Sequence, residues 1–152
     1  MKYFVTILSF AVLASALTPT VSMSQTAEDK EGVRAAVEDY VLGFYKGESE
    51  RIKRSVAENV VKYGYFIPRY QTEYRGSPMS FQQMLDYCNR VKEGGLQTAD
   101  DAVRDIEILD ILDKTAAAKL TATWGIDYMQ LAKVDGKWMI KHVMWQSHPR
   151  ES

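Results

Sequence analysis

Hydrophobic spacing divides the chain into a helical first part and a second part made mainly of strands. Apolar residues recur at helical spacing from about Glu28 to Lys46, and Gly47 is a typical helix terminator. A second, short helix is predicted from Ser49 to about Ser55, with Ser49 as its N-cap. The two segments together predict a helical hairpin.

The pattern changes to strict alternation after this hairpin. Val60–Ile67 alternates between two faces, which predicts a strand, and Pro68 ends it because proline cannot donate to a β-ladder. Arg69–Pro78 is polar and rich in turn residues. We expect it to form a loop or a short β-arm around Gly76.

A capped helix and a run of strands follow. Ser80 and Gln83 have the spacing of a capping box, and the glycine pair at 94–95 closes the helix. Asp105–Leu112 and Thr115–Trp124 read as strands on either side of a tight turn. The second of these strands carries alanines on one side, which either leave space near the axis of a curved sheet or let a helix approach closely.

Residues 123–146 read as two long antiparallel strands joined by the Asp-Gly pair at 135–136. Asp-Gly between alternating apolar runs is a strong hairpin signal, because both central positions of a type I′ turn need a positive φ. Counting outward from the turn sets Met129 opposite His142. Asp127 then becomes a diagonal neighbour of His142 on an otherwise apolar face.

The order of elements predicts an α+β fold, in which three helices pack on one face of a bent antiparallel sheet. The first 24 residues resemble a secretory signal: Lys2 is followed by the apolar run Phe4–Leu17 and a small-x-small site. We expect cleavage after Ser24, a periplasmic or secreted location, and no membrane span afterwards. Residues 25–152 then form a single domain of ordinary size.

Charge and composition exclude several classes of function. The 19 Lys and Arg and the 20 Asp and Glu are spread along the chain, so no basic surface for nucleic acid is predicted. Cys88 is the one cysteine, so no intramolecular disulfide can form, and it reads as a small buried hydrophobe. The two histidines show no metal-ligand spacing. We predict no metal and no cofactor.

Three stretches of the chain resemble the nuclear-transport-factor-2-like (NTF2-like) superfamily. They are VRAAVEDYVLGFYKGESERIKRSV, SFQQMLDYC and IDYMQLAKVDGKWMIKHVMWQS. Within the superfamily the chain is most similar to the branch called putative lumazine-binding proteins, beside the SnoaL-like (polyketide-cyclase-like) and ketosteroid isomerase groups. The likeness covers essentially all of residues 25–152.

The resemblance implies a cone-shaped half-barrel with a pocket between helices and sheet, and homodimerisation through the sheet. It places Trp138 and the following isoleucine on the concave side, so that Asp127 and His142 would line the cavity. Related cyclases and isomerases perform acid-base chemistry with a pocket Asp, and the matching residue is Asp127. A His often found after the second helix is absent here, where the chain reads Val56–Asn59.

These observations predict a site and leave its role open. Asp127 and His142 are either a proton-transfer pair or a buried hydrogen bond that fixes strand register, or Asp127 is paired instead with a nearby Lys or Arg. The predicted ligand pocket consists of Tyr40, Phe44, Tyr63, Tyr65, Met84, Trp124, Met129 and Trp138. The predicted dimer face on the convex side of the sheet consists of Tyr128, Met139, Val143 and Trp145.

Three functions remain open at this point. The first is binding of a small, largely apolar, planar molecule in the pocket without turnover. The second is a cofactor-independent isomerase, dehydratase or cyclase that uses Asp127 as general base. The third is a non-catalytic, dimeric accessory domain, in which side chains would fill the cavity.

Overall fold

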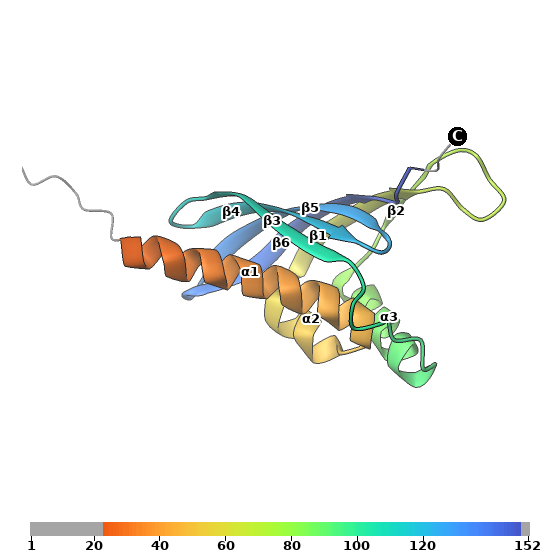
Figure 1. Ribbon diagram of the computed structural model, residues 1–152, viewed down its shortest axis with the longest axis horizontal. Coiled ribbons are helices and arrows are strands. Elements are labelled where there is room, and N and C mark those ends of the chain that lie inside the picture. Colours follow the sequence, from red (N-terminus) through yellow and green to blue (C-terminus); the bar gives the residue numbers. More distant parts are fainter. Residues whose placement is uncertain (1–22, 150–152) are drawn as a thin grey trace, which may run out of the picture.

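The structure is a computed structural model that describes residues 23–149, and side chains from residue 27 onward (Figure 1). The elements in chain order are α1 Met23–Lys46, α2 Ser49–Ser55, β1 Val56–Phe66, β2 Arg75–Pro78, α3 Phe81–Glu93, β3 Arg104–Ile111, β4 Thr115–Ala122, β5 Gly125–Val134 and β6 Lys137–Gln146. Residues 1–22 of the predicted export signal lie outside the described residues, and the signal stays a prediction. Within residues 23–149 no helix is long and apolar enough to cross a membrane.

The six strands form one sheet in the order β2-β1-β6-β5-β4-β3. Strands β3 to β6 are an antiparallel meander, whereas β1 joins β6 in parallel. Figure 1 shows all three helices on the same face of this curved sheet. The predicted α+β half-barrel is confirmed, with the correction that its sheet is mixed, because alternation along a strand does not encode the direction of its neighbour.

Helix α1 supplies the main contact between the helices and the sheet. Its buried residues include Val33, Val37, Tyr40, Val41 and Phe44. The facing strand β4 buries the small side chains of residues 116, 118 and 122, all alanine, which let the helix come close as predicted. The buried hydroxyl of Tyr45 accepts a hydrogen bond from the backbone N–H of Thr123 at 2.8 Å and donates to the carbonyl of Val103. These bonds fix the end of α1 against the sheet.

The ends of α3 agree with the predictions, whereas the starts of α1 and α2 differ from them. Ser80 forms the predicted capping box with Gln83, and Gly94 caps α3. The predicted N-cap Ser49 is wrong, because Ser49 is the first residue of α2 and Glu48 precedes it without a side-chain cap. The carboxylate of Glu48 instead pairs with Arg51 one turn further along. Helix α1 also begins before the predicted residue Glu28.

The closing hairpin has the predicted turn but not the whole predicted register. Asp135 and Gly136 have φ of 48° and 80°, and pairing follows the prediction as far as Leu131 and Ile140. Lys141 is then an extra residue in β6, a β-bulge, and beyond it Gln130 pairs with His142. A shift of one residue turns every following side chain to the opposite face. The predicted register is therefore wrong from Lys141 to the end of β6.

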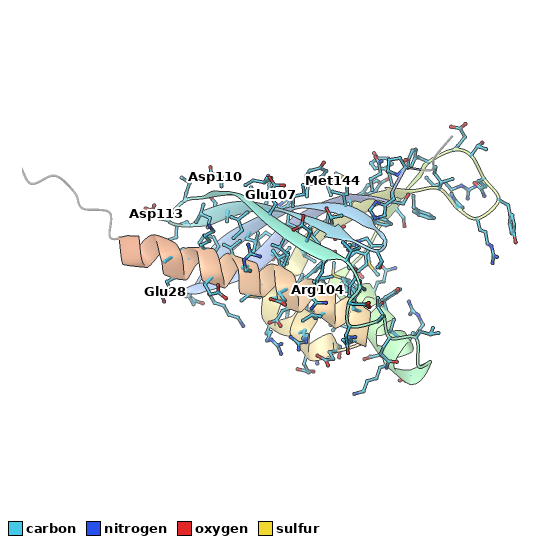
Figure 2. All side chains as sticks on the ribbon, viewed as in Figure 1. Glu28, Arg104, Glu107, Asp110, Asp113 and Met144 are labelled. Carbon is cyan, nitrogen blue, oxygen red and sulfur yellow. The ribbon has the colours of Figure 1, made fainter. Side chains whose placement is uncertain are left out.

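The predicted convex face changes for the same reason. Tyr128 is exposed and Met139 half-buried on the outer face of the sheet, as predicted. Val143 is buried and Trp145 is packed against the core on the helix side, so both of these assignments are wrong. Figure 2 shows Met144, which takes their place, on the face turned away from the helices.

Candidate functional site

The bulge in β6 brings three side chains together on the inner face of three adjacent strands. Lys62 of β1 lies beside Val143, and Gly64 lies beside Trp145. Trp145 in turn pairs with Asp127 of β5. Lys62, Trp145 and Asp127 therefore face the helices from neighbouring positions of β1, β6 and β5.

These strands and the helices line a pocket that is open to the surface and has a volume of about 180 Å³. Its walls are Phe44 of α1, Lys62 of β1, Met79, Tyr87 of α3, Trp124 and Trp145. Lys62 is the one charged residue among these six, and the rest are aromatic apart from Met79. The pocket is therefore an apolar, mainly aromatic chamber with a single amine.

Glycine at position 64 makes room for one wall of this pocket. A Cβ atom at Gly64 would lie 1.8 Å from Nε1 of Trp145, which is far inside van der Waals contact. The Trp145 ring can lie across β1 only because Gly64 has no side chain. The ring also stacks on Phe66, with 6.3 Å between centroids and 7° between planes.

A chain of polar groups runs from the pocket into the core. The Lys62 ammonium donates to the Tyr40 hydroxyl, which is hydrogen-bonded in turn to the Asp127 carboxyl group. The indole Nε1 of Trp124 donates to both carboxyl oxygens of Asp127, at 3.3 and 3.2 Å. No buried side-chain nitrogen or oxygen between residues 27 and 149 lacks a hydrogen-bond partner. Of the four groups, Lys62 and Trp124 border the pocket.

Burial moves the pKa values of the acid and the base towards each other. It raises the pKa of Asp127, and the charge of Lys62 and the hydrogen bonds of Trp124 and Tyr40 offset part of that rise. It lowers the pKa of Lys62, which the charge of Asp127 partly offsets. Burial and the neighbouring Asp127 also raise the pKa of Tyr40 well above its usual value. The site therefore disfavours an isolated charge on Lys62 and an isolated charge on Asp127.

Three aromatic rings surround the Lys62 amine. Its Nζ lies 5.0 Å from the ring centroid of Tyr40, 5.2 Å from Phe44 and 5.7 Å from Trp145. Ring faces attract a cation within about 6 Å, so they stabilise the ammonium form of Lys62. The amine is therefore positioned by four contacts, counting the Tyr40 hydroxyl.

The comparisons with known proteins place the chain in a family. The family model described as "Putative lumazine-binding" matches residues 28–146. The chain belongs to the putative lumazine-binding family. The predicted resemblance to this branch of the NTF2-like superfamily is confirmed.

Solved structures similar to this family member support its fold. An NTF2-like protein of unknown function from Silicibacter pomeroyi has a TM-score of 0.61 at 16% identity, over 81% of this chain and 98% of that one. One from Methylobacillus flagellatus has a TM-score of 0.60 at 21% identity, over 86% and 97% of the two chains. Among the curated proteins, aldolase FrzH of a Cladobotryum species is 25% identical over 131 residues, 82% of this chain and 96% of FrzH.

The predicted Asp127–His142 pair does not exist in this lumazine-binding family member. Asp127 is fully buried on the inner face, whereas His142 is exposed on the outer face opposite Gln130. The bulge at Lys141 explains the error, because it moves His142 to the other side of the sheet. Asp127 also lies behind Trp124 and does not border the pocket. A catalytic role of either residue stays a prediction.

The predicted pocket residues fall into three groups. Phe44 and Trp124 line the pocket, and Tyr40 lies directly behind it, with its ring 5.0 Å from Phe44 and 6.3 Å from Trp124. Tyr63 and Tyr65 are wrong, because the inner face of β1 consists of Lys62, Gly64 and Phe66 and the two tyrosines alternate with them.

The other three predicted pocket residues lie in the core. Met84 and Met129 are buried and do not border this pocket. Trp138 packs near the other end of α1, where its Nε1 donates to Asp29 at 3.1 Å, and Lys133 pairs with the same carboxylate at 2.6 Å. Their assignment to the pocket is wrong, because apolar periodicity identifies the inner face but not which part of it remains open.

Lys62 is the site residue that sequence reasoning missed. It shares a strand face with Val60, Gly64 and Phe66, and a single lysine on an apolar strand face is the signal that could have found it.

The cysteine and the possible metal-binding side chains add nothing to the site. Cys88 is buried as predicted, which raises the pKa of its thiol to about 11. Within residues 23–149 no three His, Cys, Asp or Glu residues cluster so as to hold a metal ion.

Proposed function

We propose that this protein binds a small, largely apolar molecule in the aromatic pocket, with a polar group of that molecule directed at Lys62. The observation that carries the proposal is the pocket itself, with aromatic walls and one buried amine. Ligand sites in proteins are typically apolar chambers with a few convergent polar groups. The family name points in the same direction, since it describes small-molecule binding.

The volume of the pocket limits the size of the ligand. A cavity of about 150 Å³ in another protein holds benzene. The 180 Å³ here therefore suits a single aromatic ring with a small substituent. An open pocket also argues against the accessory-domain hypothesis, which requires side chains to fill the cavity. A bicyclic molecule such as lumazine would require the pocket to widen.

Calorimetric titration with p-cresol and, separately, with lumazine tests the proposal. We expect saturable 1:1 binding of p-cresol, and weaker or no binding of lumazine. Met79→Trp should reduce affinity for p-cresol at least about tenfold, because the larger side chain of this lining residue fills part of the pocket. Met139→Trp, on the outer face of β6, is the matched control and should bind as wild type does. Equal affinity in the two variants would place the ligand elsewhere.

We also propose that two copies of the chain associate through the outer face of the sheet. Val61, Leu109, Tyr128 and Met144 are between 51% and 58% exposed there, and together they line one shallow groove. An apolar patch of this kind on a soluble protein supports an interface between copies.

Sedimentation analysis of single charge variants checks the dimer. Wild type should sediment at twice the mass of the chain. Tyr128→Glu should shift it to the monomer, because the charge would be buried without a partner in the interface. Leu96→Glu introduces the same charge at a residue that is 70% exposed and outside the groove, and should leave the dimer intact. A monomeric wild type would refute the proposal.

A further inference from the structure

The amine in the pocket differs from the other paired lysines of the protein. Lys46, Lys53, Lys119 and Lys133 form direct ion pairs with carboxylates at 2.5 to 3.5 Å, whereas Lys62 is in none of the ion pairs found among the described residues. Its nearest polar partner is a neutral hydroxyl, that of Tyr40. It is also 7% exposed, and that remaining exposure opens into the pocket. A lysine buried for structural reasons would be expected to contact its carboxylate directly.

From this geometry, and resting on the ligand binding proposed above, we propose that Lys62 is a nucleophilic amine. It would form an imine with an aldehyde or ketone group on a small aromatic ligand. Tyr40 and Asp127 would act as positioning and proton-relay residues behind it. The pocket supplies what this reaction needs: an amine held at the wall of an apolar chamber, and a proton donor on the far side of that amine.

The amine can become neutral without exchanging a proton with solvent. Lys62 donates to Tyr40 and Tyr40 is hydrogen-bonded to Asp127, so a shift of one proton along this chain converts the ammonium-carboxylate pair into an amine and a carboxylic acid. The net charge of the pair is zero in both forms. Burial favours the neutral form, because it lowers the pKa of Lys62 and raises that of Asp127.

The covalent step balances within the site. The lone pair of the neutral Lys62 nitrogen attacks the carbonyl carbon, the C=O π bond breaks, and the oxygen takes up the amine's proton to give a carbinolamine. The proton held by Asp127 returns through Tyr40 to the carbinolamine oxygen, the C–O bond breaks, and water leaves. The product is an iminium ion on Lys62, with the Asp127 carboxylate restored on the far side of Tyr40. No oxidant, reductant or cofactor takes part.

The surroundings favour the iminium once it forms. Asp127 regains its negative charge on the same side of the pocket, and the rings of Phe44 and Trp145 already lie within cation-π distance of Nζ. An aromatic ring on the carbonyl group would occupy the chamber between Trp124 and Tyr87. The proposed ligands are therefore aryl aldehydes and small aryl ketones.

Reductive trapping with benzaldehyde and sodium cyanoborohydride at pH 7 tests the inference on the intact protein. Intact mass should show one added benzyl group, and peptide mapping should place it on Lys62. We expect Lys62 to be labelled at least about tenfold faster than any exposed lysine. Lys62→Met should lose this fast phase, whereas Lys114→Met, in an exposed turn, should keep it.

Binding of p-cresol separates this inference from the proposed function, because p-cresol has no carbonyl group. A circular dichroism spectrum like that of wild type shows that Lys62→Met is folded, so that loss of labelling reports the missing amine alone. If wild type binds p-cresol and Lys62 is labelled no faster than exposed lysines, the imine proposal is overturned and ligand binding stands. If wild type neither binds p-cresol nor is labelled, both fail.

The proton relay from Lys62 through Tyr40 to Asp127 can be tested separately from imine formation. Tyr40→Phe removes the hydroxyl between Lys62 and Asp127 but keeps the ring that packs on Phe44, so its circular dichroism spectrum should be that of wild type. Labelling of Lys62 should slow at least about tenfold at pH 7 and recover as the pH rises, because bulk base then removes the proton. An unchanged rate and pH profile in Tyr40→Phe would exclude the relay.

Discussion

Asp127→Asn is expected to lower the free energy of unfolding by about 2 to 3 kcal/mol at neutral pH, because it leaves a buried lysine without its counter-charge. Asp127 is fully buried, and its charge is the one that holds up the pKa of Lys62. With that charge gone, the pKa of Lys62 should fall further. Urea unfolding followed by circular dichroism measures the change.

The pH dependence of this variant follows from the direction of the Lys62 shift. The pKa of Lys62 is lower in the folded protein than its usual value of 10.5, so between these two values the unfolded chain binds more protons. Stability must then rise with pH across this interval. Because the pKa of Lys62 falls further in Asp127→Asn, this pH interval should be wider in the variant than in wild type. The difference in unfolding free energy between wild type and the variant should therefore diminish as the pH approaches 10.5.

A double variant and a surface control test whether the stability loss in Asp127→Asn comes from the charge of Lys62. Lys62→Met combined with Asp127→Asn removes both charges and should recover stability to within about 1 kcal/mol of wild type, with little dependence on alkaline pH. Asp105→Asn removes an exposed carboxylate and should change stability by less than about 0.5 kcal/mol. If Asp127→Asn resembled Asp105→Asn, Asp127 and Lys62 would not be coupled.

Gly64→Ala is expected to lower the free energy of unfolding by about 2 to 3 kcal/mol and to disrupt ligand binding together with it. The added Cβ would lie 1.8 Å from Nε1 and 2.0 Å from Cε2 of Trp145, so the indole must move. Moving it removes one wall of the pocket and breaks the stack with Phe66. Denaturant unfolding and p-cresol titration measure the two effects.

Shortening the tryptophan should reverse the steric part of this effect. In the background of Trp145→Val, where no indole crosses β1, Gly64→Ala should cost less than about 0.5 kcal/mol. The coupling free energy between the two positions would then account for most of the loss in the single variant. A large cost of Gly64→Ala in both backgrounds would instead assign the effect to the backbone of β1.

The parts of the fold that local patterns determine were predictable from the sequence. The capping box of Ser80, the turn at Asp135 and the inward alanines of β4 each depend on residues a few positions apart. The parallel pairing of β1 with β6 depends on residues about 80 positions apart and has no local signature. The bulge at Lys141 has none either, because lysine fits both a regular strand and a bulged one.

The candidate site was predictable only where it depended on inward-facing apolar residues. Phe44 and Trp124 follow from periodicity and line the pocket. His142 and the two tyrosines of β1 were misplaced because each assignment needed the correct face of a strand. Lys62 was missed because the strand was read as apolar on both sides, and a buried lysine without a direct ion pair contradicts the usual exposure of that residue. Local rules fail most often where a residue serves function.

The bulge also affects how relatives of this protein should be aligned with it. In a sequence alignment, a one-residue gap placed at Lys141 in β6 decides whether His142 or Val143 is matched to a given pocket residue of a homologue. Both alignments would preserve the Asp-Gly-Lys-Trp motif and score almost equally at low identity. Catalytic residues in β6 should therefore be assigned from homologues by structural superposition rather than by sequence alignment.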